Sequence, residues 1–266
     1  MTSTEFAAAT VTVERDGHVL LIGLNRPEKH NAFTREMISD LSRAYALLES
    51  DDDLRVGVLY GHGTHFTAGL DLIDVAPLLT SGASPFAAGG RDPWRLDGTW
   101  TKPIVAVAHG WAMTLGIELL LAADIRVAAG NVRFTQMEVR RGIYPFGGAT
   151  FRFPRECGWG NAMRWILTGD EFGAEEAQRI GLVQEVADDF RQALQRAKDI
   201  ATTIATSAAP RSVQSVLESA HVARQRGDQA SIDRLLPTLG ELLTTSDAAE
   251  GVQSFVERRP AVFTGH

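Results

Sequence analysis

The stretch HGWAMTLGIELLLAAD, residues 109–124, decides how the rest of the chain is interpreted. It follows an apolar run at 103–108 that is typical of a buried strand, and from Gly116 onward it predicts a helix. Glu118 lies in the first turns of that helix among apolar neighbours. Burying a lone carboxylate is costly, so we expect Glu118 to be paired, protonated or used chemically. The peptide dipoles and free N–H groups of a helix start favour a negative charge there.

A single glutamate on a helix is usually exposed to solvent, so Glu118 alone does not define a site. A second carboxylate, Glu138, stands just after the strand expected at 132–135, near the start of the turn-rich segment QMEVRRGIYPFGGAT, residues 136–150. Two carboxylates can hold one water and divide acid and base work between them. Glu118 and Glu138 are therefore the candidate catalytic pair.

The composition is that of an ordinary globular protein. The chain has 266 residues, 44% of them hydrophobic, and a formal net charge of −7, which argues against a general nucleic-acid-binding surface. The single cysteine, Cys157, excludes an intrachain disulfide and is interpreted as a packing residue. The first residues lack the features of a signal peptide, and no uncharged run approaches the ~18 residues of a membrane span. We therefore expect a soluble, cytoplasmic protein.

Strand and helix patterns alternate along most of the chain before it becomes wholly helical. Residues 11–15 and 19–24 flank the turn signal Asp16-Gly17 and predict a hairpin, and Thr34 predicts the N-cap of a helix that runs to about Ser50. This alternation is typical of an α/β fold with a largely parallel sheet, and the change of pattern places a soft boundary near Ala205. Further strands are expected at 56–60, 125–128, 132–135 and 182–186. Further helices are expected at 151–167, with a break at Gly158 and Gly160 around Trp159, at 174–180, and from 188 to about 258, with breaks near Pro210, Gly227 and Pro237.

Segments that could hold a nucleotide or a metal do not carry a complete motif. Gly61-His62-Gly63 begins like a dinucleotide-binding loop, but Phe66 occupies the third glycine position. Neither a G-x-S-x-G nucleophile elbow nor a P-loop occurs, and the seven histidines lack zinc-like spacing, so no metal site is expected. Residues 73–98 are rich in proline and glycine and predict a mobile loop with a short helix near a ligand entrance.

Five segments, in order along the chain, resemble the crotonase family, also called the enoyl-CoA hydratase/isomerase superfamily. Each match is weak alone, and their order makes the resemblance specific. The segments are LNRPEKHNAF from residue 24, VGVLYGHGTHFTAGLDL from 56, the Glu118 stretch, FTQMEVRRGIYPFGGAT from 134 and EGVQSFVERRPAVFTGH from 250. They match the family's LNRP-x-x-x-NA, G-x-G-x-x-F-x-A-G-x-D-L, G-G-G-x-E-L, P-E-x-x-x-G and E-G-x-x-A-F-x-E-K-R patterns.

The resemblance implies a core spiral of β-β-α repeats, residues 1–205, followed by a C-terminal helical trimerisation segment, residues 206–266. It also implies a homotrimer or dimer of trimers that acts on acyl-CoA thioesters. No metal or redox cofactor is expected, because CoA is part of the substrate. Members of the family hold the oxygen of a thioester enolate between two backbone N–H groups. By position these belong to Leu70 and Leu115, both where a loop enters a helix.

The family's hydratases carry two glutamates that match Glu118 and Glu138, so the expected activity is hydration of the 2,3 double bond of an enoyl-CoA. Glu118 would help to activate water for attack on the β-carbon, and Glu138 would supply the proton at the α-carbon. By the same resemblance, the residues expected to line the CoA and acyl sites are Glu28, Lys29, Ala32, Ala68, Gly69, Asp71, Leu72, Gly116, Tyr144 and Phe146.

The family pattern is broken at three places. Thr114-Leu115-Gly116 replaces three glycines, Met137 replaces the proline before the second glutamate, and Tyr144-Pro145-Phe146 makes the acyl pocket bulkier. Two alternatives therefore stay open. One is a related acyl-CoA enzyme, such as an isomerase, dehydratase or carbon–carbon hydrolase, and the other is a non-catalytic acyl-CoA-binding protein. The altered turn favours the binding protein, and the two glutamates favour an enzyme.

Overall fold

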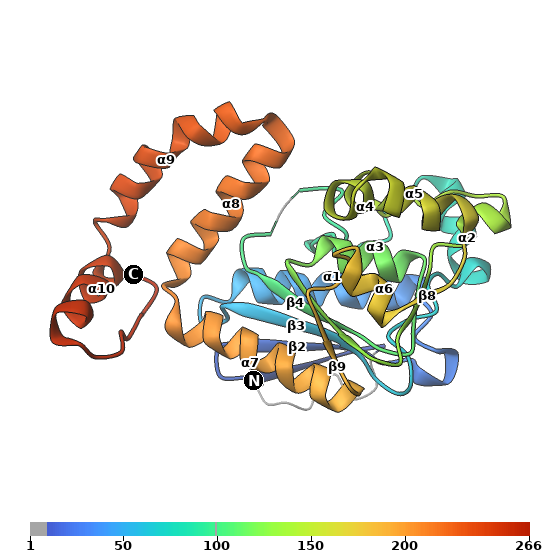
Figure 1. Cartoon of the computed structure of the whole chain (residues 1–266), viewed down its shortest axis with the longest axis horizontal. Coiled ribbons are helices and arrows are strands. Elements are labelled where there is room, and N and C mark those ends of the chain that lie inside the picture. Colours follow the sequence, from blue (N-terminus) through green and yellow to red (C-terminus); the bar gives the residue numbers. More distant parts are fainter. Residues whose placement is uncertain (1–9, 99) are drawn as a thin grey trace.

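A six-stranded sheet forms the centre of the molecule (Figure 1). The computed structural model describes residues 10–98 and 100–266. β1 and β2 form the predicted antiparallel hairpin, and every other neighbouring pair in the order β1-β2-β3-β4-β6-β9 is parallel. The prediction of an α/β fold with a largely parallel sheet is therefore confirmed. The strands are β1 (Val11–Asp16), β2 (Val19–Leu24), β3 (Val56–Gly61), β4 (Ile104–Ala108), β6 (Ile125–Ala129) and β9 (Glu185–Ala187).

A second, three-stranded sheet brings the two candidate glutamate segments side by side. β5 (Trp111–Met113) pairs in parallel with β7 (Arg133–Thr135), and β8 (Phe172–Gly173) runs antiparallel to β7. In this register Met113 lies opposite Thr135, so the chain leaves both strands at the same end of the sheet. Glu118 lies shortly after the end of β5, and Glu138 lies shortly after the end of β7. The sequence did not predict β5, because three residues are too few to show a period.

The two faces of the large sheet bury separate sets of side chains. On one face α7 (Phe190–Ser207) packs through alanines four residues apart, Ala193, Ala197, Ala201 and Ala205, against strand valines. The other face packs against a larger core that contains α1 (Arg35–Ser50) and α3 (Leu115–Ala122), and Figure 1 shows these helices on the side of the sheet opposite α7. Both candidate glutamates lie on segments that belong to this second side.

The helices of the core begin and end close to the predicted positions. α1 (Arg35–Ser50) starts after Thr34, whose hydroxyl accepts a 3.2 Å hydrogen bond from the backbone N–H of Met37. The strand expected at 182–186 is shorter, because Leu182 and Val183 turn inward and become buried in the core before β9 begins. The other elements are η1 (Pro27–Lys29), α2 (Leu72–Ser81), α3 (Leu115–Ala122), η2 (Glu138–Arg141), α4 (Ala149–Cys157), α5 (Trp159–Thr168) and α6 (Ala174–Arg179).

Three helices after α7 extend away from the core (Figure 1). They are α8 (Pro210–Arg226), α9 (Asp228–Leu242) and α10 (Ser246–Glu257). The predicted break at Pro237 is wrong: Pro237 lies inside α9, where its exposed position lets water bind the carbonyl that loses its N–H partner. These helices expose large apolar side chains such as Leu236 and Phe255, which fits the predicted oligomerisation segment, although the assembly itself stays a prediction. No helix among residues 10–98 and 100–266 is long and apolar enough to cross a membrane.

Candidate active site

Glu118 is fully buried near the start of α3. Its Oε1 atom accepts hydrogen bonds from the backbone N–H groups of Gly147, at 2.8 Å, and of Ala149, at 3.0 Å. Its Oε2 atom is buried and has no partner in the part of the chain that the structure describes. Burial raises the pKa of Glu118 to about 7; the N–H donors oppose that rise, and the charge of Glu138 adds to it. A carboxyl group with this pKa can exchange a proton at neutral pH.

Glu138 is the second buried carboxylate, with 5% of its surface exposed at the first position of η2. Its Oε1 atom accepts a 2.8 Å hydrogen bond from Nε2 of Gln136. Its Oε2 atom, like that of Glu118, is buried without a partner among the described residues. Burial also raises the pKa of Glu138, while its own backbone N–H and the Gln136 amide act to lower it. Each glutamate is therefore held by one oxygen and leaves the other free for a ligand.

The two carboxylates form one electrostatic unit. The charge on Glu138 raises the pKa of Glu118, so the second proton is harder to remove than the first. Buried polar atoms normally have partners, and two free carboxylate oxygens in one interior region indicate a place for water or a substrate group. The structure thus brings together the two glutamates that the sequence singled out, and their roles in a reaction stay a prediction.

The loop that carries Leu70 turns one backbone N–H away from its neighbouring segment. Phe33 donates from its N–H to the carbonyl of Gly69 at 2.7 Å and accepts from the N–H of Asp71 at 2.9 Å. In such a parallel bridge the N–H of the middle residue, Leu70, points to the opposite side. Among the described residues the N–H of Leu70 has no hydrogen-bond partner. It is therefore available to a ligand, and its role as an oxyanion donor stays a prediction.

Leu115, the other predicted donor, is the first residue of α3. Its N–H has no partner within residues 10–98 and 100–266, whereas its carbonyl accepts a 3.0 Å hydrogen bond from Nε1 of Trp94. Thr114, just before it, has φ 49° and ψ −116°, a backbone conformation that favours glycine. The glycine of the family pattern would adopt this conformation without strain, whereas Thr114 adopts it at a conformational cost.

The two donor loops are in direct contact. A Cβ atom built on Gly69 would lie 1.9 Å from Oγ1 of Thr114, so a side chain at Gly69 does not fit. The turn of Thr114 and the turn of Gly69, which also has a positive φ of 89°, therefore fix each other's position. The side chain of Leu115 is buried, and its Cδ1 atom would lie 2.7 Å from a Cβ on Gly147. Leu115 thus narrows the space beside the Glu118 carboxylate, which lies at the same distance from that Cβ.

The segments predicted to bind CoA lie side by side. The N–H of Ala68 donates to the carbonyl of His30 at 2.8 Å, and Nη1 of Arg26 bonds both to the carbonyl of Ala32 and to Oδ2 of Asp71 at 3.1 Å. Gly69 and Gly116 are buried, Ala32, Ala68 and Asp71 are half-buried, and Glu28, Lys29, Leu72, Tyr144 and Phe146 are exposed. Their contacts with a substrate stay a prediction.

Four residues that support the site were not identified from the sequence. Gln136 holds Glu138, Trp94 holds Leu115, and Arg26 clamps the two loops of the CoA-binding prediction. Asn31 is buried at a positive φ of 55°, and its amide donates to the carbonyls of His62 and His65. For Trp94 a signal existed, because a buried indole N–H needs an acceptor. Arg26 and Asn31 belong to the LNRPEKHNAF segment, which signalled them without a role, whereas Gln136 acts through a folded neighbour that no spacing rule reveals.

Comparison with known proteins adds an independent line of evidence. The family model described as enoyl-CoA hydratase/isomerase matches residues 14–266. The chain belongs to the enoyl-CoA hydratase/isomerase family. This confirms the resemblance drawn from the five segments and, with the structural likeness below, the crotonase-like fold.

Individual relatives of this family cover nearly the whole chain. A probable enoyl-CoA hydratase/isomerase from Mycobacterium abscessus has a crystal structure that matches with a TM-score of 0.94 and 52% identity, covering 97% of this chain and 99% of that one. Enoyl-CoA hydratase EchA19 of Mycobacterium tuberculosis is 34% identical over 94% of this chain and 95% of its own length. The (E)-benzylidenesuccinyl-CoA hydratase of Thauera aromatica is 35% identical over 96% of this chain and 99% of its own.

Proposed function

We propose that this member of the family is an enoyl-CoA hydratase, which adds water across the 2,3 double bond of an enoyl-CoA thioester. The observation that carries the proposal is the pair of buried glutamates, each anchored through Oε1 and each with a free Oε2. Relatives named as hydratases support the same activity. A protein that only bound acyl-CoA would gain nothing from two buried carboxylates of raised pKa, whose burial costs stability.

In the proposed reaction, Glu118 accepts a hydrogen bond from a water molecule and helps to remove its proton as the oxygen attacks the β-carbon. Glu138 delivers a proton to the α-carbon. The water has then been divided into a hydroxyl on the β-carbon and a hydrogen on the α-carbon, and one proton remains shared by the two carboxyl groups. Transfer of this proton from Glu118 back to Glu138 would return the pair to its starting state.

Attack on the β-carbon places negative charge on the thioester oxygen. We propose that the backbone N–H groups of Leu70 and Leu115 hold this oxygen. The lack of a partner for either N–H among the described residues supports this role. The mutual contact between the Gly69 and Thr114 turns would keep the two donors in place. One donor of this kind can contribute about 3–4 kcal/mol to a transition state.

The remaining parts of the proposal concern the ends of the substrate and the assembly. The CoA moiety would lie along the paired segments 28–32 and 68–72, and the acyl group would reach the free oxygens of Glu118 and Glu138. The buried Leu115 side chain beside Glu118 would limit the width of the acyl group at this point. The exposed apolar side chains of α8 to α10 support assembly into a homotrimer or a dimer of trimers.

Purified protein mixed with crotonyl-CoA tests the proposal through the loss of the 2-enoyl thioester absorbance. Turnover to 3-hydroxybutyryl-CoA is the expected result. A different product from a panel of acyl-CoA thioesters would instead identify an isomerase, dehydratase or hydrolase. Tight binding of crotonyl-CoA with no conversion of any thioester would identify a non-catalytic acyl-CoA-binding protein.

A further inference from the structure

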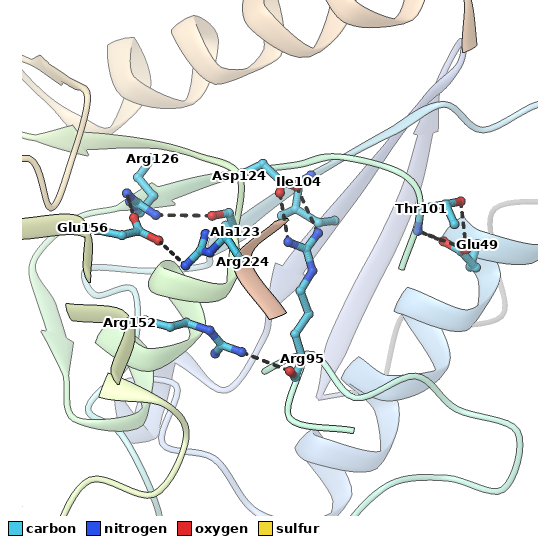
Figure 2. Close-up of polar contacts among 10 residues, drawn as sticks. All are labelled: Glu49, Arg95, Thr101, Ile104, Ala123, Asp124, Arg126, Arg152, Glu156 and Arg224. Carbon is cyan, nitrogen blue, oxygen red and sulfur yellow. Dashed lines mark hydrogen bonds and ion pairs between the residues drawn. The ribbon is translucent and has the colours of Figure 1, made fainter. Parts of the chain in front are cut away.

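A cavity of about 590 Å³ lies between α8 and the core, where α3 ends. Its described lining carries five arginines and two carboxylates, an excess of three positive charges in a chain whose net charge is −7. Figure 2 shows most of these side chains gathered around the same two carboxylates. The arginines are Arg95, Arg126, Arg152, Arg155 and Arg224, and the carboxylates are Asp124 and Glu156.

Two of the arginines have structural partners that account for them. Arg126 bonds to Glu156 at 2.5 Å and to the carbonyl of Leu182 at 2.6 Å. Arg95 forms a two-point ion pair with Asp124, at 2.9 and 3.2 Å, and its guanidinium stacks 3.8 Å from the ring centroid of Trp100. Asp124 pairs with Arg95 and Glu156 is shared by Arg126 and Arg224, so Arg152 and Arg155 form no ion pair with a described residue.

Arg152 is a buried cation without a direct ion pair among the described residues. It is 7% exposed, and its hydrogen bonds go to two backbone carbonyls, that of Arg95 at 3.0 Å and that of Gly147 at 3.4 Å. No carboxylate within residues 10–98 and 100–266 forms an ion pair with it. Burial, followed by the charges of Arg95 and Arg224, lowers the pKa of Arg152 to about 10, and the more distant carboxylates Asp92 and Glu156 offset only part of this. A buried charge without a partner is costly, and an anion would offset that cost.

Further groups around the cavity have unused hydrogen-bonding capacity. Nε of Arg95 is buried without a partner among the described residues, and only 7% of the Arg95 side chain is exposed. Nε2 of His221, on the α8 wall, is likewise buried and unpaired in that part of the chain. Arg155 is exposed and forms no ion pair with a described residue, and Arg224 shares Glu156 with Arg126 at 3.3 Å. Donors from both walls therefore face one space.

We propose that this cavity binds a small oxyanion, either a carboxylate or a phosphate group, through Arg152, Arg155, Arg224 and His221. Planar guanidinium groups suit both anions, because each offers two parallel N–H donors to a pair of oxygens. Arg152 and Arg155 of the core wall and Arg224 of α8 would contact the same anion. Its binding would therefore fasten α8 to the core, which the Arg224–Glu156 pair does only weakly at a partly exposed position.

The anion can come from solution or from the far end of the substrate. Arg152 contacts Gly147, whose N–H holds Glu118, so the cavity shares a wall with the candidate active site. Leu121 and Ala122 line the cavity one helical turn beyond Glu118 on α3. An acyl chain that ends in a carboxylate could place that group there. This second source rests on the proposed hydratase function, whereas binding of a free anion does not.

The test compares wild-type protein with Arg155→Gln/Arg224→Gln and with the matched control Arg191→Gln/Arg226→Gln, which removes the same charge from exposed positions that do not line the cavity. Inorganic phosphate is titrated calorimetrically into each protein. Separately, kcat/KM is measured for two 2-enoyl-CoA thioesters of equal length, one ending in a methyl group and the other in a carboxylate. The two measurements separate a free anion from an acyl-chain end.

The proposal predicts that the cavity variant weakens phosphate binding at least about tenfold, as expected for losing two charge-assisted donors, while the control stays within about twofold. If the acyl chain supplies the anion, the preference for the carboxylate-ended thioester falls by a similar factor in the cavity variant alone. If a free anion is the ligand, phosphate binds and this preference does not change. Absence of saturable phosphate binding together with an unchanged preference overturns the proposal. If neither thioester reacts, the hydratase function is contradicted. The phosphate titration then still tests the anion site.

Discussion

Gln136 donates a 2.8 Å hydrogen bond from Nε2 to Oε1 of Glu138, and both side chains are buried. The bond favours the ionised form of Glu138 and so acts to lower its pKa. We predict that Gln136→Met raises the pKa of Glu138 further. The limb of the pH profile that is set by the ionisation of Glu138 should then shift to higher pH. The measurement is kcat/KM for crotonyl-CoA between about pH 5 and 9. A uniform loss of rate with an unmoved limb would show that Gln136 only supports the fold.

Removal of either carboxylate should abolish most of the hydration activity. Glu118→Gln keeps an oxygen that can accept from Gly147 and Ala149, and Glu138→Gln keeps one that can accept from Gln136. The fold should therefore survive while acid–base catalysis is lost. We expect kcat for crotonyl-CoA to fall by roughly 10²–10⁴-fold in each variant. Undiminished hydration by Glu138→Gln, with the circular dichroism spectrum of the wild type, would contradict the assigned mechanism.

The raised pKa of Glu118 makes the stability of the protein depend on pH. Folding raises this pKa from 4.5 to about 7, so the native state binds more protons than the unfolded state between these values. The resulting stabilisation is complete below pH 4.5 and is lost as the pH rises through 7. Because glutamine does not titrate, Glu118→Gln should gain stability relative to the wild type over this interval, on the order of 3 kcal/mol at most. Urea unfolding at pH 5 and pH 8 measures the difference, and equal differences at the two pH values would refute the prediction.

The contact between Gly69 and Thr114 leads to a prediction about a double variant. Gly69→Ala places a Cβ atom against Oγ1 of Thr114 and also strains a residue of positive φ. We expect it to destabilise the fold by roughly 1–3 kcal/mol and to lower kcat, because the N–H of Leu70 is displaced. Thr114→Gly removes the clashing hydroxyl and relieves the strain at residue 114.

Thr114→Gly combined with Gly69→Ala should therefore recover part of both losses, and thermal unfolding and kcat for crotonyl-CoA would show the recovery. The single variant Thr114→Gly is the control and should be as active as the wild type. If the changes in stability and in kcat of the two single variants simply add in the double variant, the two loops do not constrain each other.

The sequence predicted the elements whose signals are local. Asp16-Gly17 predicted the first hairpin, Thr34 predicted the start of α1, and the glycines around Trp159 predicted the division between α4 and α5. It failed at two places, one where solvent and one where tertiary packing overrides a local signal. Pro237 is accommodated inside α9, and Leu182 and Val183 are drawn into the core instead of extending β9.

The candidate site was predictable only in part. The unusual position of Glu118 in an apolar helix and the family-like segments located both glutamates and both loops. The residues that orient them, Gln136 and Trp94, lie 2 and 21 positions away from their partners and contact them only after folding. The arginine cavity could not be foreseen, because α8, α4 and the segment before β4 supply its lining and no sequence pattern connects them.

The alanine stripe of α7 has a consequence for how this protein can change. That face of the sheet is closed by a thin seam of alanine methyl groups against valines. Every group assigned a chemical role belongs to the other side. Random mutagenesis should therefore have different effects on the two sides of the sheet. Substitutions along the seam would alter how much folded protein accumulates in cells. New substrate preferences would arise from substitutions in the loops and helices on the opposite side.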